Sequence, residues 1–63
     1  MSDFVVENHG SICLLQPMTK EARAWIEDTK PEDAMMWGTA LVVEPRYVEG
    51  VVEAATNSGY TVE

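Results

Sequence analysis

The chain has 63 residues, of which eleven are acidic and four are basic, so its formal net charge is −7. This length allows one domain, residues 1–63, near the lower limit at which a hydrophobic core is stable without disulfides or metals. A hydrophobic fraction of 46% argues against global disorder. The acidic balance argues against direct binding to nucleic acid, because phosphates are neutralised by clustered Lys and Arg, and it favours a basic protein surface as the partner.

The single cysteine, Cys13, cannot form an internal disulfide, which predicts a reducing compartment and makes the cytoplasm the expected location. The N-terminal stretch MSDFVVENHG lacks the basic start and the long apolar run of a secretory signal. No stretch approaches the roughly 18 consecutive apolar residues of a membrane span. We therefore expect neither secretion nor membrane insertion.

The first half of the sequence predicts a β-hairpin followed by a helix. Apolar runs at residues 4–6 and 12–15 flank Asn8-His9-Gly10, and Asn and Gly tolerate the positive φ angles of a tight turn. Thr19 stands in the N-cap position before KEARAWIED, in which apolar residues recur at i, i+3 and i+4. The spacing therefore predicts a helix of about nine residues after Thr19.

The second half predicts a short helix or turn, a strand, a longer helix and a final strand. Pro31 suits the first position of the short helix or turn, and TALVV at residues 39–43 is typical of a buried central strand. Pro45 opens a helix whose apolar positions continue to residue 55, and Gly59 is expected to end it as a left-handed cap. Residues 60–62 can then add a strand.

These elements predict an α+β fold, a small two-layer domain in the order β-β-α-β-α-β. About four strands would form one sheet, with the two main helices packed on one of its faces so that both apolar stripes are buried. Residues 39–62 could form a right-handed parallel crossover of strand, helix and strand.

His9 and Cys13 are the only residues that could supply a strong nucleophile–base pair or soft metal ligands. A structural zinc site needs four ligands, and Cys13 lies in an apolar strand where an inert side chain is expected. The sequence has no phosphate-binding glycine loop, no dinucleotide-binding motif and no HExxH zinc motif. We therefore expect a protein that is not an enzyme and needs no metal or cofactor.

The acidic residues differ in how well local structure explains them. Glu27 and Asp28 fall in the last turn of the first helix, where the helix dipole disfavours negative charge. Glu49 and Glu53 form a like-charge i, i+4 pair on the second helix. Charges that destabilise their own helix without visible compensation often mark a functional surface. A solvated helix face also tolerates this loss of stability, and the sequence leaves both interpretations open.

Three further residues complete the candidate partner-binding set. Glu32 and Asp33 follow Pro31, where a helix N-terminus would favour negative charge. Trp37 belongs to the run Met35-Met36-Trp37, which could be core or an interface hot spot, because three consecutive residues cannot all face inward from one helical turn. The full set is Glu27, Asp28, Glu32, Asp33, Glu49, Glu53 and Trp37.

The number of carboxylates suits imitation of a short stretch of DNA backbone. A compact domain of this length is about 27 Å across by the scaling of its radius of gyration. One DNA strand carries roughly eight phosphates over that distance. Eleven carboxylates could match that many charges if they gather on one continuous side of the molecule.

The segments NHGSICLLQPMT, AWIEDTKPEDAMMWGTALVVEPRYV and SGYTVE, which cover nearly the whole chain, together resemble small proteins encoded by bacteriophages and prophages. The shared pattern begins with a hairpin around a His-Gly turn and a helix that ends in Trp, then Ile or Val, then an acidic residue. Pro-x-Asp-Ala, an aromatic-Gly pair before a strand, and Arg-Tyr-Val follow in that order. Small acidic chains of this kind look like anti-CRISPR proteins, particularly inhibitors of type I systems such as type I-C.

The resemblance implies a phage-encoded inhibitor in the cytoplasm of the infected bacterial host. It implies binding to the basic DNA-binding surface of the Cascade complex by DNA mimicry, which would block binding of target DNA. The residues leave a second function open, that of a non-inhibitory phage accessory protein or homo-oligomeric module using a strand edge or the Met35-Met36-Trp37 surface. The expected state is a monomer or a weak homodimer.

Overall fold

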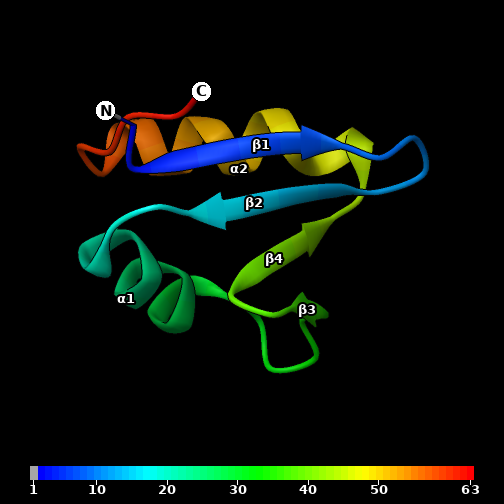
Figure 1. The fold of residues 1–63 in the computed structure, drawn as a ribbon, viewed down its shortest axis with the longest axis horizontal. Coiled ribbons are helices and arrows are strands. Elements are labelled where there is room, and N and C mark those ends of the chain that lie inside the picture. Colours follow the sequence, from blue (N-terminus) through cyan, green and yellow to red (C-terminus); the bar gives the residue numbers. More distant parts are fainter. Residues whose placement is uncertain (1) are drawn as a thin grey trace.

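The computed structural model describes residues 2–63, which form four short strands and two helices (Figure 1). In chain order the elements are β1 (Phe4–Asn8), β2 (Cys13–Pro17), α1 (Lys20–Thr29), β3 (Met36–Trp37), β4 (Ala40–Val43) and α2 (Pro45–Asn57). One antiparallel sheet with two helices confirms the α+β class.

The four strands lie in the spatial order β1-β2-β4-β3. In the predicted hairpin, Val6 of β1 pairs with Leu15 of β2. The same row continues from Leu15 to Leu41 on β4 and from Leu41 to Met36 on β3. Cross-strand partners point to the same face of a sheet, so this apolar row marks the face that packs against the helices. β4 is a central strand, as its apolar run predicts.

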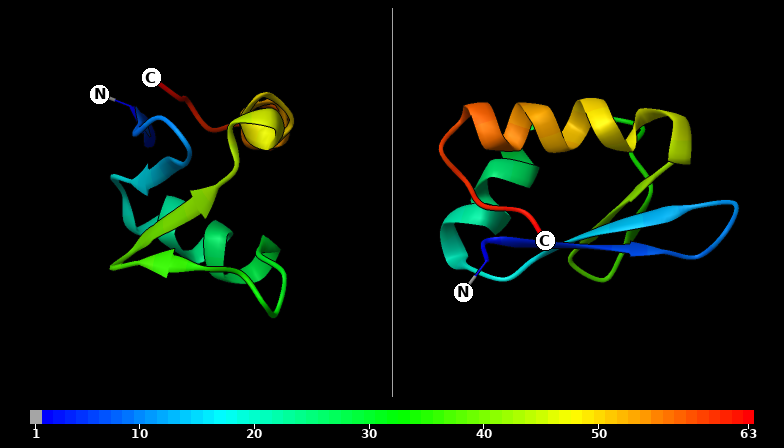
Figure 2. Two further views of the ribbon diagram at one scale, coloured as in Figure 1. Left: turned by 90° about the vertical axis from the view of Figure 1, so that its right-hand side faces the viewer. Right: turned by 90° about the horizontal axis from the view of Figure 1, so that it is seen from above.

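Both helices cover the same face of the sheet, which gives two layers (Figure 2). The buried cluster between the layers combines residues of the sheet with residues of both helices: Phe4, Leu15, Ala22, Ile26, Val43 and Ala55. The rings of Trp25 and Tyr60 pack edge-on against Phe4, each with its centroid 5.6 Å from that of Phe4. Burial of Phe4, Leu15 or Ile26 contributes about 1.5–3 kcal/mol each, so a few side chains supply most of the core's stability.

The helix ends follow the predicted capping residues. Thr19 caps α1, and its Oγ1 accepts a hydrogen bond from the backbone N–H of Ala22 at 3.1 Å. After the C-terminal end of α2, Gly59 adopts φ +94°. The backbone N–H of Gly59 bonds to the carbonyl of Thr56, and the backbone N–H of Tyr60 bonds to the carbonyl of Ala55. These two bonds form a Schellman motif, which satisfies carbonyls that the helix itself leaves free.

The segment after α1 is a turn followed by a strand, so of the two predicted alternatives at Pro31, a short helix or a turn, the turn forms. The backbone N–H of Ala34 bonds to the carbonyl of Pro31 at 3.1 Å, which closes a tight turn. Met36 and Trp37 then pair with β4 through a two-residue connection whose first residue, Gly38, has φ +63°. Pairing with the free edge of β4 satisfies backbone groups that a helix of one turn would leave open.

The predicted final strand at residues 60–62 is reduced to a single parallel bridge between Val62 and Phe4. The C-terminal segment lies along the outer edge of β1 (Figure 1), where the backbone N–H of Val6 bonds to the carbonyl of Glu63 at 2.8 Å. The segment at Val62 runs parallel to β4, as the predicted crossover required, but β2 and β1 lie between the two. The observed element order is β-β-α-β-β-α.

Candidate functional site

Four of the candidate acids lie at the end of α1 and in the turn that follows it. Glu27 and Asp28 are exposed in the last turn of α1, which contains no basic residue, so the helix dipole opposes both charges as predicted. Glu32 and Asp33 are exposed in the tight turn. Because no helix begins at Pro31, the expected stabilisation of these two charges by a helix N-terminus is absent.

Lys30 provides partial compensation that the sequence reasoning missed. Its Nζ lies 3.3 Å from Oε2 of Glu27, in an i, i+3 pair that its position just beyond α1 makes possible. The Lys30 side chain is only 27% exposed, whereas that of Glu27 is 62% exposed. The spacing of Glu27 and Lys30 in the sequence was the available signal for this pair.

Glu49 and Glu53 lie one turn apart on the exposed side of α2. Within the described residues 2–63, neither carboxylate forms an ion pair, whereas Glu44 pairs with Arg46 at 3.1 Å. Like charges at i and i+4 destabilise a helix by about 0.2–0.5 kcal/mol. The like-charge pair predicted from the sequence therefore exists without a local cation to offset it.

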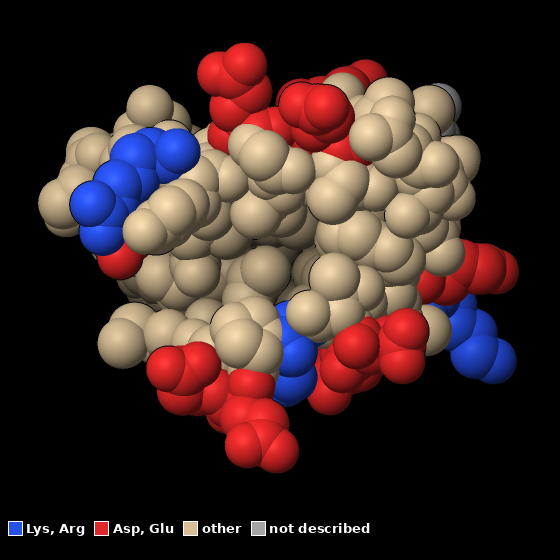
Figure 3. All heavy atoms as spheres, turned by 180° about the vertical axis from the view of Figure 1, so that it is seen from behind, with Lys and Arg blue, Asp and Glu red and all other residues tan. Residues whose placement is uncertain are grey.

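The acids of the helical side form two groups with a hollow between them, and Lys30 is the basic residue that lines this hollow (Figure 3). One group lies over α2, and the other lies over α1 and the turn after it. DNA mimicry was expected to need carboxylates on one continuous side of the molecule. On this side of the molecule the negative charge is not continuous. It consists of two acidic margins on either side of an apolar depression.

The hollow is a cleft of about 390 Å³ between α1 and α2. One wall carries Trp25 and Ile26 of α1, and the opposite wall carries Tyr47 and Val51 of α2. Pro31 and Lys30 lie at the end of α1. The sequence analysis did not predict this cleft. The sequence does contain a second stripe on α2, because residues 47, 50, 51 and 54 recur at helical spacing and all are apolar or small.

Trp37 lies on the other face of the sheet, away from the two helices. Neighbouring residues of a strand point to opposite faces, and Met36 packs against the core, so Trp37 points outward. Its side chain is 62% exposed, and the Met35 side chain beside it is 70% exposed. The structure thus separates Trp37 from the six acidic candidates and leaves it available as a distinct apolar contact.

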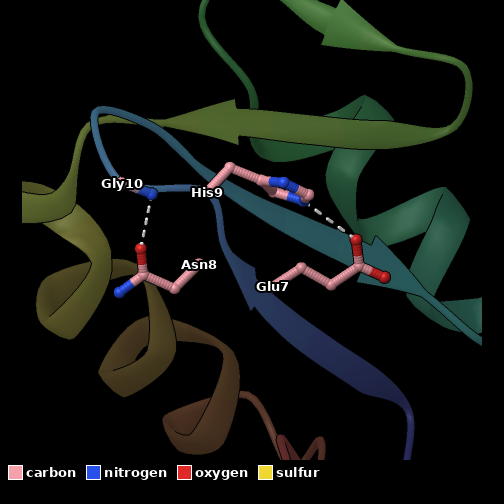
Figure 4. Close-up of polar contacts among 4 residues, drawn as sticks. All are labelled: Glu7, Asn8, His9 and Gly10. Atoms are coloured by element: carbon pink, nitrogen blue, oxygen red, sulfur yellow. Dashed lines mark hydrogen bonds and ion pairs between the residues drawn. The ribbon is translucent and has the colours of Figure 1, made fainter.

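His9 lies over the same outer face. Its ring centroid is 6.1 Å from that of Trp37, and its Nε2 lies 3.2 Å from Oε1 of Glu7 (Figure 4). The backbone N–H of Gly10 bonds to Oδ1 of Asn8 at 2.8 Å, which fixes the hairpin turn that holds His9. His9 is therefore a residue of the hairpin turn, and its side chain contacts Glu7 and Trp37.

Cys13 is 4% exposed and lies on the buried face of β2. This confirms that its thiol sits in apolar surroundings, where a thiol acts as a small hydrophobic group. Among residues 2–63 no cluster of three or more His, Cys, Asp or Glu side chains has the arrangement of a metal site. In the same part of the chain, neither helix has the length and apolarity required to cross a membrane.

Comparison of the chain with protein-family models, with curated proteins and with solved structures finds no match. The site is therefore defined by its own geometry, as two acidic margins, an apolar cleft between them and a separate exposed tryptophan.

Proposed function

We propose that the protein is a non-enzymatic inhibitor that docks its acidic margins on a basic protein surface. The observation that carries this proposal is the unpaired state of five exposed acids on the two margins. Within the described chain, the acids that make no ion pair on these margins are Asp28, Glu32, Asp33, Glu49 and Glu53.

Unpaired carboxylates of this number are complementary to a surface that binds a nucleic-acid backbone. The molecule measures 27 Å along its longest axis, over which a single DNA strand carries roughly eight phosphates at about 3.4 Å each. A groove lined by Lys and Arg gains similar electrostatic attraction from either ligand. Because the two margins are separated, they resemble two rows of phosphates more than a single row.

The specific partner that we propose is the DNA-binding surface of a type I CRISPR effector, the Cascade complex. This step comes from the resemblance of the sequence to small acidic phage proteins that look like anti-CRISPR proteins. The protein would then be phage-encoded, act in the cytoplasm of the infected bacterium and block binding of target DNA. The net charge of −7 supports a partner of this basic character.

The experiment is a binding and competition assay with a purified type I Cascade complex. Binding should compete with target DNA, and its affinity should fall at least about tenfold between about 50 and about 200 mM salt. The double reversal Glu49→Lys/Glu53→Lys should weaken binding strongly. The matched control Glu7→Lys/Glu63→Lys changes the net charge equally, but it lies on β1 and the C-terminal segment and should have a smaller effect.

Three results would each reject the proposal: binding that salt does not weaken, DNA loading that proceeds unchanged in the complex, or equal effects of the two double reversals. Equal effects would mean that only net charge matters and that the margins have no special place in the interface.

The exposed side chains of Met35 and Trp37 favour a second candidate function, a non-inhibitory phage accessory module or homo-oligomer. Light scattering separates it from the first candidate. A stable dimer that dissociates in the Trp37→Ala variant, while Glu49→Lys/Glu53→Lys leaves it intact, would support the second function.

A further inference from the structure

The cleft between α1 and α2 is a defined apolar space in a very small protein. Its volume of about 390 Å³ falls in the range of natural ligand sites, about 300–1,000 Å³. The lining residues come from both helices and from β4, with Leu41 contributed by the strand. An open space of this size leaves apolar surface unpacked in a chain whose core is already near the minimum.

Gly50 is the residue that keeps one wall of the cleft open. It lies inside α2, where glycine is less favourable than every residue except proline, and its φ is not among the positive values of Gly10, Gly38 and Gly59. A Cβ atom built on Gly50 would meet nothing within 4 Å. Neither backbone conformation nor close packing therefore requires glycine here, and its effect is to leave the wall of the cleft without a side chain.

The charges around the cleft restrict what it can accept. Glu53 lies three residues after Gly50, so its carboxylate borders the stripe of α2 that lines the cleft, whereas Glu49 lies one residue before Gly50 and faces away from that stripe. The acids of α1 and its following turn lie on the opposite side (Figure 3). Lys30 also lines the cleft, but its Nζ pairs with Glu27 at 3.3 Å, so the unpaired charges of the two margins are negative and attract an apolar group flanked by cations.

We propose that the cleft receives the apolar side chains of an amphipathic basic helix, whose Lys and Arg residues contact the two acidic margins. Helices bind grooves in this way through apolar anchors at i, i+3, i+4 and i+7. The inference deepens the proposed function and rests on it, because it supplies the apolar anchor and the helical form of the same basic partner. It assigns the specificity of binding to the cleft and the long-range attraction to the margins.

The test selects binders from a displayed library of random 16-residue peptides. Selected peptides are then titrated against the Trp37→Phe variant, in which Trp25 is the remaining tryptophan and reports from the cleft wall. We expect the selected sequences to combine apolar residues at helical spacing with flanking Lys or Arg. Binding should change the fluorescence of Trp25 and weaken with salt.

Two cleft-filling variants and one matched control locate the bound peptide. Gly50→Leu and Ala54→Leu each place a leucine side chain in the cleft, and both should weaken binding about tenfold or more, the change that corresponds to losing one buried apolar anchor. Ala24→Leu adds the same side chain at an exposed position of α1 outside the cleft and should leave affinity unchanged. Circular dichroism verifies that all three variants are folded.

Several results would overturn the inference. These are a library that yields no binder, selected peptides without basic residues, tighter binding of decanoate than of any peptide, or equal binding to Gly50→Leu and the parent. Failure of the two proposals can be told apart. If Cascade binding responds to Glu49→Lys/Glu53→Lys but not to Gly50→Leu, only the cleft inference fails. If Gly50→Leu abolishes peptide binding while Cascade binds neither form, only the proposed function fails.

Discussion

Replacing Gly50 with alanine should stabilise the protein, although it alters a residue that lines the proposed site. Glycine in a helix interior costs about 0.5–1 kcal/mol relative to alanine, because it loses more backbone freedom on folding. The added methyl group meets no atom within 4 Å, so no clash subtracts from this gain. For a domain of this size, 1 kcal/mol corresponds to a rise in Tm of about 4–8 °C. We therefore expect Gly50→Ala to raise Tm by about 2–8 °C.

Thermal unfolding followed by circular dichroism measures this shift, and unfolding in guanidinium chloride gives the free energy independently. Gly59→Ala is the internal control with the opposite sign. Gly59 has φ +94°, where an L side chain is strained, so the same substitution should destabilise by about 1–2 kcal/mol. A Gly50→Ala variant with an unchanged or lower Tm would show that glycine is needed for folding at this position. Glycine at position 50 would then be explained by folding and not by the cleft.

Six further variants test other contacts of the structure. Thr19→Ala should destabilise by about 0.5–2 kcal/mol because it removes the cap of α1, whereas Thr19→Ser should retain most of the stability. Ile26→Val should cost about 0.5–1.5 kcal/mol and Ile26→Ala about 2–5 kcal/mol by denaturant unfolding, since this side chain is 1% exposed. Glu49→Lys/Glu53→Lys should slow association with a basic partner, in stopped-flow measurements, more than it speeds dissociation. Trp37→Ala should change the free energy of unfolding by less than about 1 kcal/mol, because most of this residue is exposed.

Features set by neighbouring residues could be predicted from the sequence, whereas features set by distant partners could not. The caps at Thr19 and Gly59 were predicted because each depends on backbone groups within a few residues. Residues 36–37 were assigned to the short helix or turn after Pro31, because the strand that they form exists only through its pairing with β4. Met35, Met36 and Trp37 are all apolar, so the sequence has no alternation here that would have distinguished a strand from a helix.

The candidate site shows the same division. The sequence placed Glu27, Asp28, Glu49 and Glu53 at exposed helical positions, and the structure has them there. It could not place the two helices relative to one another, because that depends on how both pack against the sheet. The separation of the acids by a cleft is a consequence of this packing, so the second stripe on α2 indicated one wall of the cleft but not the cleft itself.

Two residues that weaken α2, Gly50 and Glu53, lie beside the cleft. Gly50 costs the helix about 0.5–1 kcal/mol, and the repulsion between Glu49 and Glu53 costs about 0.2–0.5 kcal/mol more. A domain of this length has a total stability of about 3–9 kcal/mol, so these costs take a substantial share of it. Alanine at position 50 and lysine at position 53 would remove both costs without disturbing any buried contact, since both positions are exposed. Features that weaken the fold at an exposed surface, and that together produce an open apolar wall with a negative border, are best explained by what that surface binds.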